Sequence, residues 1–143
     1  MVNPRLAAAA LVGVLIGVPL SAQTNHSDLA ALSTLQPGQW TLHGLDASSH
    51  SKSLCIADLR AFLQIEHGKA QCGRFVISDT PGNAVVHYTC PGQGHGQTRL
   101  RVETPRLIQI DSQGVHDNQP FAVSYEARRV GECRTLVSSS RTR

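Results

Sequence analysis

Short segments in which apolar and polar residues alternate dominate this chain of 143 residues. Residues 97–103 and 121–128 are the clearest examples, and most of the segments between residues 74 and 128 share the pattern. Successive side chains of a β-strand point to opposite faces, so each segment has one apolar and one polar face. Strands of this kind joined by short turns predict a mainly β fold, a curled or barrel-like antiparallel meander of about six strands.

One short helix interrupts the predicted strands, which places the fold near the border with the α+β class. Its apolar residues recur at three- and four-residue steps and form one stripe, and Gly68 is placed to end it. The stripe consists of Ile56, Leu59, Phe62 and Leu63. Before it, a first strand begins at Pro37-Gly38-Gln39-Trp40, and residues 53–56 can pair back on that strand. The helix is expected to cover one end or one face of the sheet.

The N-terminal residues have the arrangement of a secretory signal peptide. Arg5 precedes an uncharged run from Leu6 to Leu20 and the small pair Ser21-Ala22, which predicts cleavage near Ala22 and no membrane anchor afterwards. The predicted organisation is a signal peptide at 1–22, a flexible leader at 23–35, one disulfide-bonded β-rich domain at 36–134 and a disordered tail at 135–143. The mature protein is therefore expected in the periplasm or outside the cell.

The charge of the chain excludes one class of partner. The formal net charge is +3, and cleavage after Ala22 would leave +2 because it removes Arg5. So little positive charge, without interleaved aromatic residues, does not predict a nucleic-acid-binding surface.

Four cysteines remain in the predicted mature chain: Cys55, Cys72, Cys90 and Cys133. An even number in a small exported domain predicts two disulfides, which stabilise a modest core. The separations of 17, 18 and 43 residues lack the close pairs of a zinc site. A simple meander favours Cys72–Cys90 with Cys55–Cys133. If Phe75 lies opposite Tyr88 so that both are buried, Cys72 and Cys90 fall on opposite faces, which favours Cys55–Cys72 with Cys90–Cys133. Both pairings stay open.

Several short motifs together resemble the bacterial domain of unknown function 3617 family. They are Pro37-Gly38-x-Trp40, Leu54-Cys55-Ile56, the pair Cys72 and Cys90 around a hairpin, and Arg129-Val130-Gly131-Glu132-Cys133. The resemblance spans residues 35–133. It implies an exported, envelope-associated protein of Gram-negative bacteria and supplies no activity.

The candidate ligand-binding residues are aromatic. They are Trp40, Phe75, Tyr88, Phe121 and Tyr125, and they can line an apolar cavity between sheet and helix or simply fill the core. We favour core filling, because a chain with so few aromatic residues has few to spare.

The candidate metal-binding residues are His87, His95 and His116, of which His95 lies in a glycine-rich loop. Their spacing matches no known ligand motif, so no metal or other cofactor is predicted. The mature chain also lacks a G-x-S-x-G motif, and no catalytic residue is assigned.

The resulting hypothesis is a non-enzymatic exported binding domain. It would bind either a small apolar molecule in the concavity of the sheet or an envelope protein along a strand edge. The alternative is an envelope metal-binding protein or hydrolase that uses His95 with neighbouring histidines and carboxylates.

Overall fold

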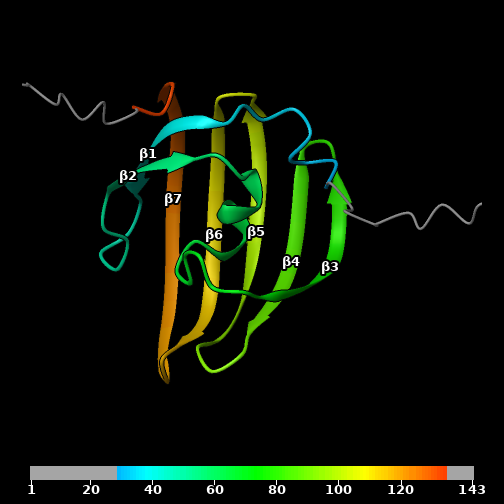
Figure 1. Ribbon diagram of the computed structural model, residues 1–143, viewed down its shortest axis with the longest axis vertical. Coiled ribbons are helices and arrows are strands. Elements are labelled where there is room, and N and C mark those ends of the chain that lie inside the picture. The colour runs from blue at the N-terminus through cyan, green and yellow to red at the C-terminus, as the bar shows by residue number, and fades with distance from the viewer. Residues whose placement is uncertain (1–28, 135–143) are drawn as a thin grey trace, which may run out of the picture.

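The computed structural model describes residues 29–134 as a seven-stranded antiparallel sheet with one short helix. The strands are β1 (Gly38–Gly44), β2 (Lys52–Ile56), β3 (Gly73–Thr80), β4 (Asn83–Cys90), β5 (Gly94–Thr104), β6 (Leu107–His116) and β7 (Gln119–Gly131). Their order is β2-β1-β7-β6-β5-β4-β3, so β2 and β3 are the two edges and the sheet is open (Figure 1). The predicted fold class is confirmed. The predicted signal peptide, the start of the leader and the tail lie outside the described residues.

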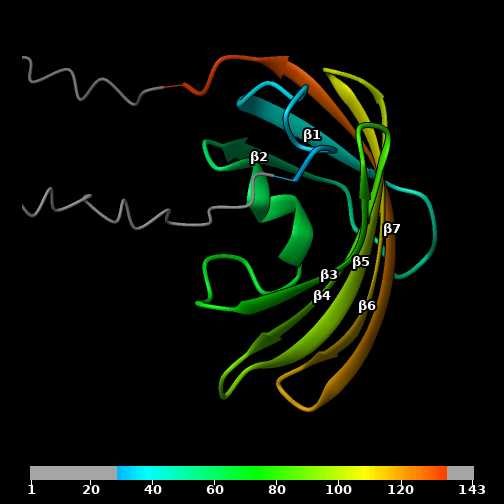
Figure 2. The same cartoon turned by 90° about the vertical axis from the view of Figure 1, so that its right-hand side faces the viewer.

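The sheet is strongly curved, and two pieces of the chain fill its concave side (Figure 2). One is the helix η1 (Leu59–Gln64) and the other is the segment 29–35. Together with inward-facing residues of β1 and of β4 to β7, they form one hydrophobic core cluster. The largest fully buried side chains include Trp40, Tyr88, Phe62, Leu42, Leu63 and Leu100. The concave side is therefore the hydrophobic core.

Residues 29–35, which the sequence assigns to a flexible leader, instead belong to this core. Leu29, Leu32 and Leu35 are almost completely buried, because consecutive turns bring every third residue to the same side. The Asp79 carboxylate at the end of β3 accepts hydrogen bonds from the backbone N–H groups of Ala30 and Ala31, at 2.6 and 3.1 Å. A side chain 49 positions away thus fixes this segment.

The helix is shorter than its apolar stripe predicts, and it is a 3-10 helix. Asp58 caps its start by accepting a hydrogen bond from the backbone N–H of Arg60. Phe62 and Leu63 are buried as the stripe predicts, but Ile56 belongs to β2. Three residues of the predicted stripe therefore contact the core from the helix, with Leu59 partly buried, and one contacts it from a strand.

The predicted register of the β3–β4 hairpin is wrong by one residue. Phe75 pairs with His87 rather than Tyr88, and Val76 rather than Ile77 pairs with Val86. A one-residue shift moves each side chain of a strand to the other face. Phe75 is therefore 69% exposed on the outer face, and all eight residues of β3 are exposed.

The disulfides are Cys72–Cys90 and Cys55–Cys133, the first of the two open alternatives. Because Gly73 pairs with Thr89, the preceding residue Cys72 lies opposite Cys90, at a Cα–Cα distance of 4.2 Å. The observed register therefore removes the geometric objection to this bond. Two disulfides indicate an oxidising, non-cytoplasmic compartment. Within residues 29–134, no helix is long and apolar enough to span a membrane.

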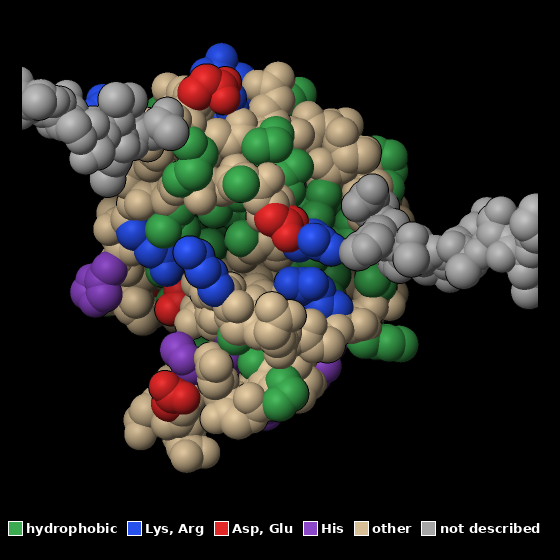
Figure 3. All heavy atoms as spheres, in the orientation of Figure 1, with side chains coloured by type: hydrophobic (Ala, Val, Ile, Leu, Met, Phe, Trp, Pro, Cys, Tyr) green, Lys and Arg blue, Asp and Glu red, His purple; other side chains and the backbone are tan. Residues whose placement is uncertain are grey.

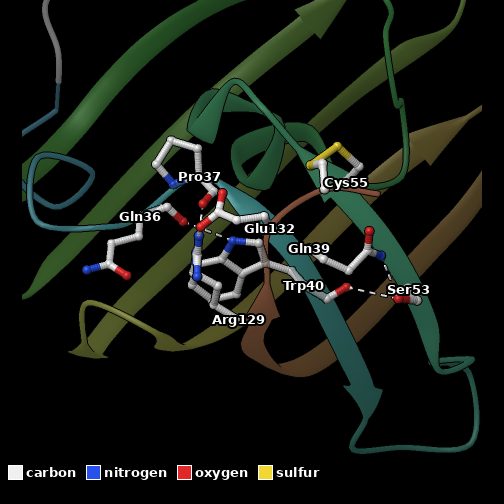
Figure 4. The surroundings of a disulfide bond; sticks show 9 residues. Gln36, Pro37, Gln39, Trp40, Ser53, Cys55, Arg129 and Glu132 are labelled. Atoms are coloured by element: carbon white, nitrogen blue, oxygen red, sulfur yellow. Dashed lines mark hydrogen bonds and ion pairs between the residues drawn. A yellow bond between two sulfur atoms is a disulfide. The ribbon is translucent and has the colours of Figure 1, made fainter. Parts of the chain in front are cut away.

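The Cys55–Cys133 disulfide lies where motifs distant in sequence meet (Figure 4). Trp40 donates from Nε1 to the carbonyl of Gln36, at 3.1 Å, and Arg129 donates from Nε to the carbonyl of Pro37, at 2.7 Å. Gly38 has a φ of 143°, and a Cβ there would lie 2.4 Å from the carbonyl oxygen of Gly131. Glycine at position 38 of the Pro-Gly-x-Trp motif thus allows the close approach of β1 and β7.

Candidate functional site

Four of the five predicted ligand-lining aromatic residues contribute to the core. Trp40, Tyr88 and Tyr125 are at most 2% exposed, and Phe121 packs against the core from β7. Phe75 lies on the outer face and is separated from them by the sheet. The concave side of the sheet, where the sequence analysis placed a possible apolar ligand, is filled by η1 and residues 29–35.

The three candidate metal-binding histidines do not meet. His87 and His95 lie on the outer face with ring centroids 6.0 Å apart, beside a shallow pocket of about 380 Å³. His116 points to the inner face, where its ring centroid lies 4.5 Å from that of His67. Within residues 29–134, no three His, Cys, Asp or Glu side chains are grouped to hold a metal ion.

His67 is a buried polar residue that sequence reasoning did not single out. It is 4% exposed, and its Nδ1 lies 3.1 Å from the Tyr88 hydroxyl, whereas its Nε2 has no hydrogen-bond partner in the described part of the chain. Tyr88 in turn lies over Gly96, where a Cβ would come within 2.4 Å of the hydroxyl oxygen. These contacts make the His67 cluster part of the packed interior.

The edge strand β3 presents an exposed apolar surface. Its outer edge pairs with no strand of residues 29–134, and Phe75, Val76 and Ile77 are 69%, 40% and 52% exposed. Natural sheets shorten or charge such edges to prevent pairing. The opposite edge, β2, follows this rule because it has five residues and begins with Lys52. The β3 edge has eight residues, with a bulge between Val76 and Ser78 and charged residues only near its ends, so that Phe75, Val76 and Ile77 form an uncharged stretch.

A basic pocket of about 330 Å³ lies between η1, residues 68–72 and the start of β3. Its charged lining residues are Arg60, Lys69, Arg74 and Asp58. Lys and Arg side chains gather across the middle of the face in Figure 3, below a group of hydrophobic side chains. Because Arg74 is the second residue of β3, the pocket adjoins the start of the β3 edge.

Gln64 of η1 forms the rigid part of the basic pocket. It is 2% exposed, and its Nε2 donates to the carbonyl oxygens of Gly68 and Ala70, at 2.9 and 2.8 Å. Its Oε1 accepts a hydrogen bond from the Arg74 guanidinium. The Cys72–Cys90 disulfide anchors the other end of the same loop. Gln64 thus holds both the loop backbone and Arg74.

Within residues 29–134, the lining of the basic pocket has more positive than negative side chains. Arg60 makes a bidentate ion pair with Asp58, with contacts of 2.8 to 3.1 Å, which lowers the pKa of that carboxyl. Arg74 bonds a neutral amide, and no carboxylate among residues 29–134 lies within 4.0 Å of it. Burial and the charge of Arg60 lower the pKa of Arg74. A second carboxylate in the pocket would offset this excess charge.

An apolar groove of about 800 Å³ adjoins the basic pocket and shares Asp58 and Arg60 with it. Leu32 and Leu35, which line it, are only 6% exposed. The side chains of Pro37, Ala57 and Leu59 complete its apolar lining.

Sequence reasoning missed Arg60, Lys69, Arg74 and the exposure of Phe75. One signal was present, because Phe75-Val76-Ile77 is an unbroken apolar run in a chain of alternating strands. Such a run is typical either of a strand that is buried on both faces or of an edge strand that binds a partner. The requirement that Cys72 lie opposite Cys90 favours the second interpretation.

Comparisons with known proteins add no residue roles. The chain matches no protein-family model, no curated protein and no solved structure.

Proposed function

We propose that this domain is a non-enzymatic binding module that captures an extended segment of a partner protein by strand addition at β3. The observation that carries the proposal is the outer edge of β3, which pairs with no strand in the described part of the chain and has three consecutive exposed apolar residues. In strand addition, main-chain hydrogen bonds supply affinity and pockets for alternate side chains supply specificity.

The distribution of exposed apolar side chains supports this choice of surface. Five large apolar side chains are exposed among residues 29–134, and three of them are neighbours on β3. The other two are Leu45 and Val130, which are isolated from each other and from β3. Scattered apolar residues are normal on a protein surface, whereas three consecutive exposed apolar residues on an edge strand offer an added strand apolar side chains on both faces of the sheet.

The charge next to β3 defines the class of partner. The basic pocket adjoins the start of the strand, and its lining within residues 29–134 includes three cationic side chains and one carboxylate. A complementary segment would carry an acidic residue at that end and alternating apolar residues beside Phe75. A second copy of this chain fits less well, because the Asp79 carboxylate that an antiparallel β3 would bring toward Arg74 already accepts hydrogen bonds from the backbone of Ala30 and Ala31.

The proposed place of action is the periplasm. The two disulfides support an oxidising compartment. The predicted signal peptide with cleavage near Ala22, and the resemblance to the domain of unknown function 3617 family, both agree with this and stay predictions. The partner would then be another protein of the cell envelope.

Replacing Phe75 with Ser should weaken binding of an extended peptide about tenfold. The probe is an eight-residue amidated peptide of alternating valine and threonine with one glutamate near its C-terminus, where an antiparallel partner meets Arg74. Burying an apolar aromatic side chain contributes about 1.5 kcal/mol or more, which corresponds to about tenfold in Kd. Isothermal titration calorimetry measures the change. The control is Leu45→Ser, because Leu45 is 60% exposed but lies outside β3.

Equal peptide affinity of Phe75→Ser and Leu45→Ser would contradict the proposal. So would a dimer, seen by sedimentation equilibrium, that Phe75→Ser dissociates, since a second copy would then occupy the edge. A third contradicting outcome comes from comparing a chain that starts at residue 23 with one that starts at residue 29. If only the shorter chain binds the peptide, residues 23–28 block the β3 edge, and its occupant is the chain itself.

A further inference from the structure

We propose that the basic pocket is a carboxylate-recognition subsite that makes the β3 edge selective for segments with an acidic side chain or a free C-terminus. The inference rests on the proposed strand addition and names the chemical group that the added strand must carry.

The register of β3 directs a partner side chain into the basic pocket. Arg74 pairs with Tyr88, which faces the core, so Arg74 lies on the inner face of the sheet. Directly opposed residues of antiparallel strands point to the same face. The residue of an added strand opposite Arg74 therefore points toward the inner face, where the pocket lies.

The basic pocket is organised before a ligand arrives. Gln64 holds Arg74 and the loop carbonyls of Gly68 and Ala70, and Asp58 holds Arg60 in a bidentate pair. Side chains that are already ordered lose less conformational entropy on binding. A ligand group that enters the pocket meets positioned donors rather than free side chains.

The charge and shape of the donors favour a carboxylate. Arg74 shares its guanidinium with a neutral amide oxygen, and Lys69 lines the same pocket. A guanidinium matches the two oxygens of a carboxylate in a bidentate arrangement. One ligand carboxylate would reduce the charge excess of the pocket without displacing Asp58 from Arg60.

The test compares the glutamate peptide with its glutamine counterpart on two forms of the domain. On the unmodified domain, the change from glutamate to glutamine should weaken binding by about tenfold to a hundredfold, the range for a hydrogen bond between charged groups. On Arg74→Gln the two peptides should bind alike, because the carboxylate has lost its partner. The matched control is Arg101→Gln, since Arg101 lies on β5, 60% exposed, and bonds Glu103.

Three outcomes separate this inference from the proposed function. If both peptides bind the unmodified domain equally, the carboxylate subsite is contradicted and strand addition stands. If neither binds, strand addition itself is contradicted. A glutamine peptide with a free C-terminal carboxylate that regains the lost affinity would support the subsite and assign it to chain ends.

A second probe tests the basic pocket without any peptide. Titration with acetate should shift the Nε–H NMR signal of Arg74 in a saturable way, and Lys69→Gln should weaken this response. The exposed Arg101 serves as the reference. If acetate leaves the Nε–H signal of Arg74 unchanged, as it does that of Arg101, the subsite is contradicted. Since Lys69 is exposed, its replacement should leave the fold intact.

Discussion

Removal of the Cys55–Cys133 disulfide is expected to lower the free energy of unfolding by about 4.5 kcal/mol. The bond closes a loop of 78 residues, and a crosslink stabilises a protein mainly by restricting the unfolded chain. The Cys72–Cys90 bond closes 18 residues, and the same relation gives about 3.2 kcal/mol. The double variant Cys55→Ala/Cys133→Ala should therefore be less stable than Cys72→Ala/Cys90→Ala by about 1.3 kcal/mol.

Urea denaturation of the two double variants and the unmodified domain, followed by far-UV circular dichroism, measures this difference. Each double variant serves as the control for the other, because both remove two sulfur atoms and introduce the same side chains. A greater loss of stability from the 18-residue bridge would contradict the loop-closure account. It would show that Cys72–Cys90 stabilises chiefly through its effect on the folded β3–β4 hairpin.

Replacement of Trp40 with Ala is expected to lower the free energy of unfolding by about 3–5 kcal/mol. Trp40 is completely buried, and its ring packs edge-on against Phe62 with centroids 5.0 Å apart. Its indole N–H also satisfies the carbonyl of Gln36, so the variant leaves both a cavity and an unpaired acceptor. Trp40 belongs to the same core cluster as residues of η1 and of the segment 29–35, so the variant should weaken the packing of all three elements.

Circular dichroism is the appropriate readout, because Trp40 is the only tryptophan of the chain. The control Trp40→Phe keeps most of the ring volume but removes the N–H donor, so its loss should be clearly smaller. A loss below about 1.5 kcal/mol for Trp40→Ala would contradict the central place of this side chain in the core.

The strands could be predicted because their signal is local. Alternation along β5 and β7 identifies the buried face residue by residue, and the helix stripe correctly includes Phe62 and Leu63. These predictions required no knowledge of what each segment contacts.

The register of β3 could not be predicted, because two physical requirements conflicted. Burial of Phe75 favours its pairing with Tyr88, whereas the Cys72–Cys90 bond requires the neighbouring register. The structure satisfies the disulfide and leaves Phe75 exposed. The exposed edge on which the proposed function depends is a direct consequence of this outcome.

The segment 29–35 and the basic pocket were missed for a different reason. Asp79 binds Ala30 across 49 positions, and Gln64 joins Arg74 to a loop that local patterning shows only as polar. Such contacts depend on which elements the fold brings together. A sequence pattern predicts which face of a helix or strand is buried, but it does not predict which other element packs against that face.

The most direct test of the account is residue-resolved amide hydrogen exchange of β3 with and without the glutamate peptide. The account predicts that the β3 amides not paired with β4 exchange rapidly in the free domain. With peptide at 100 times its Kd, their exchange should slow about a hundredfold, while that of β2 stays unchanged. Rapid exchange of these amides in the peptide-saturated domain, or their protection in the free domain, would contradict the claim that β3 is an open edge for a partner strand.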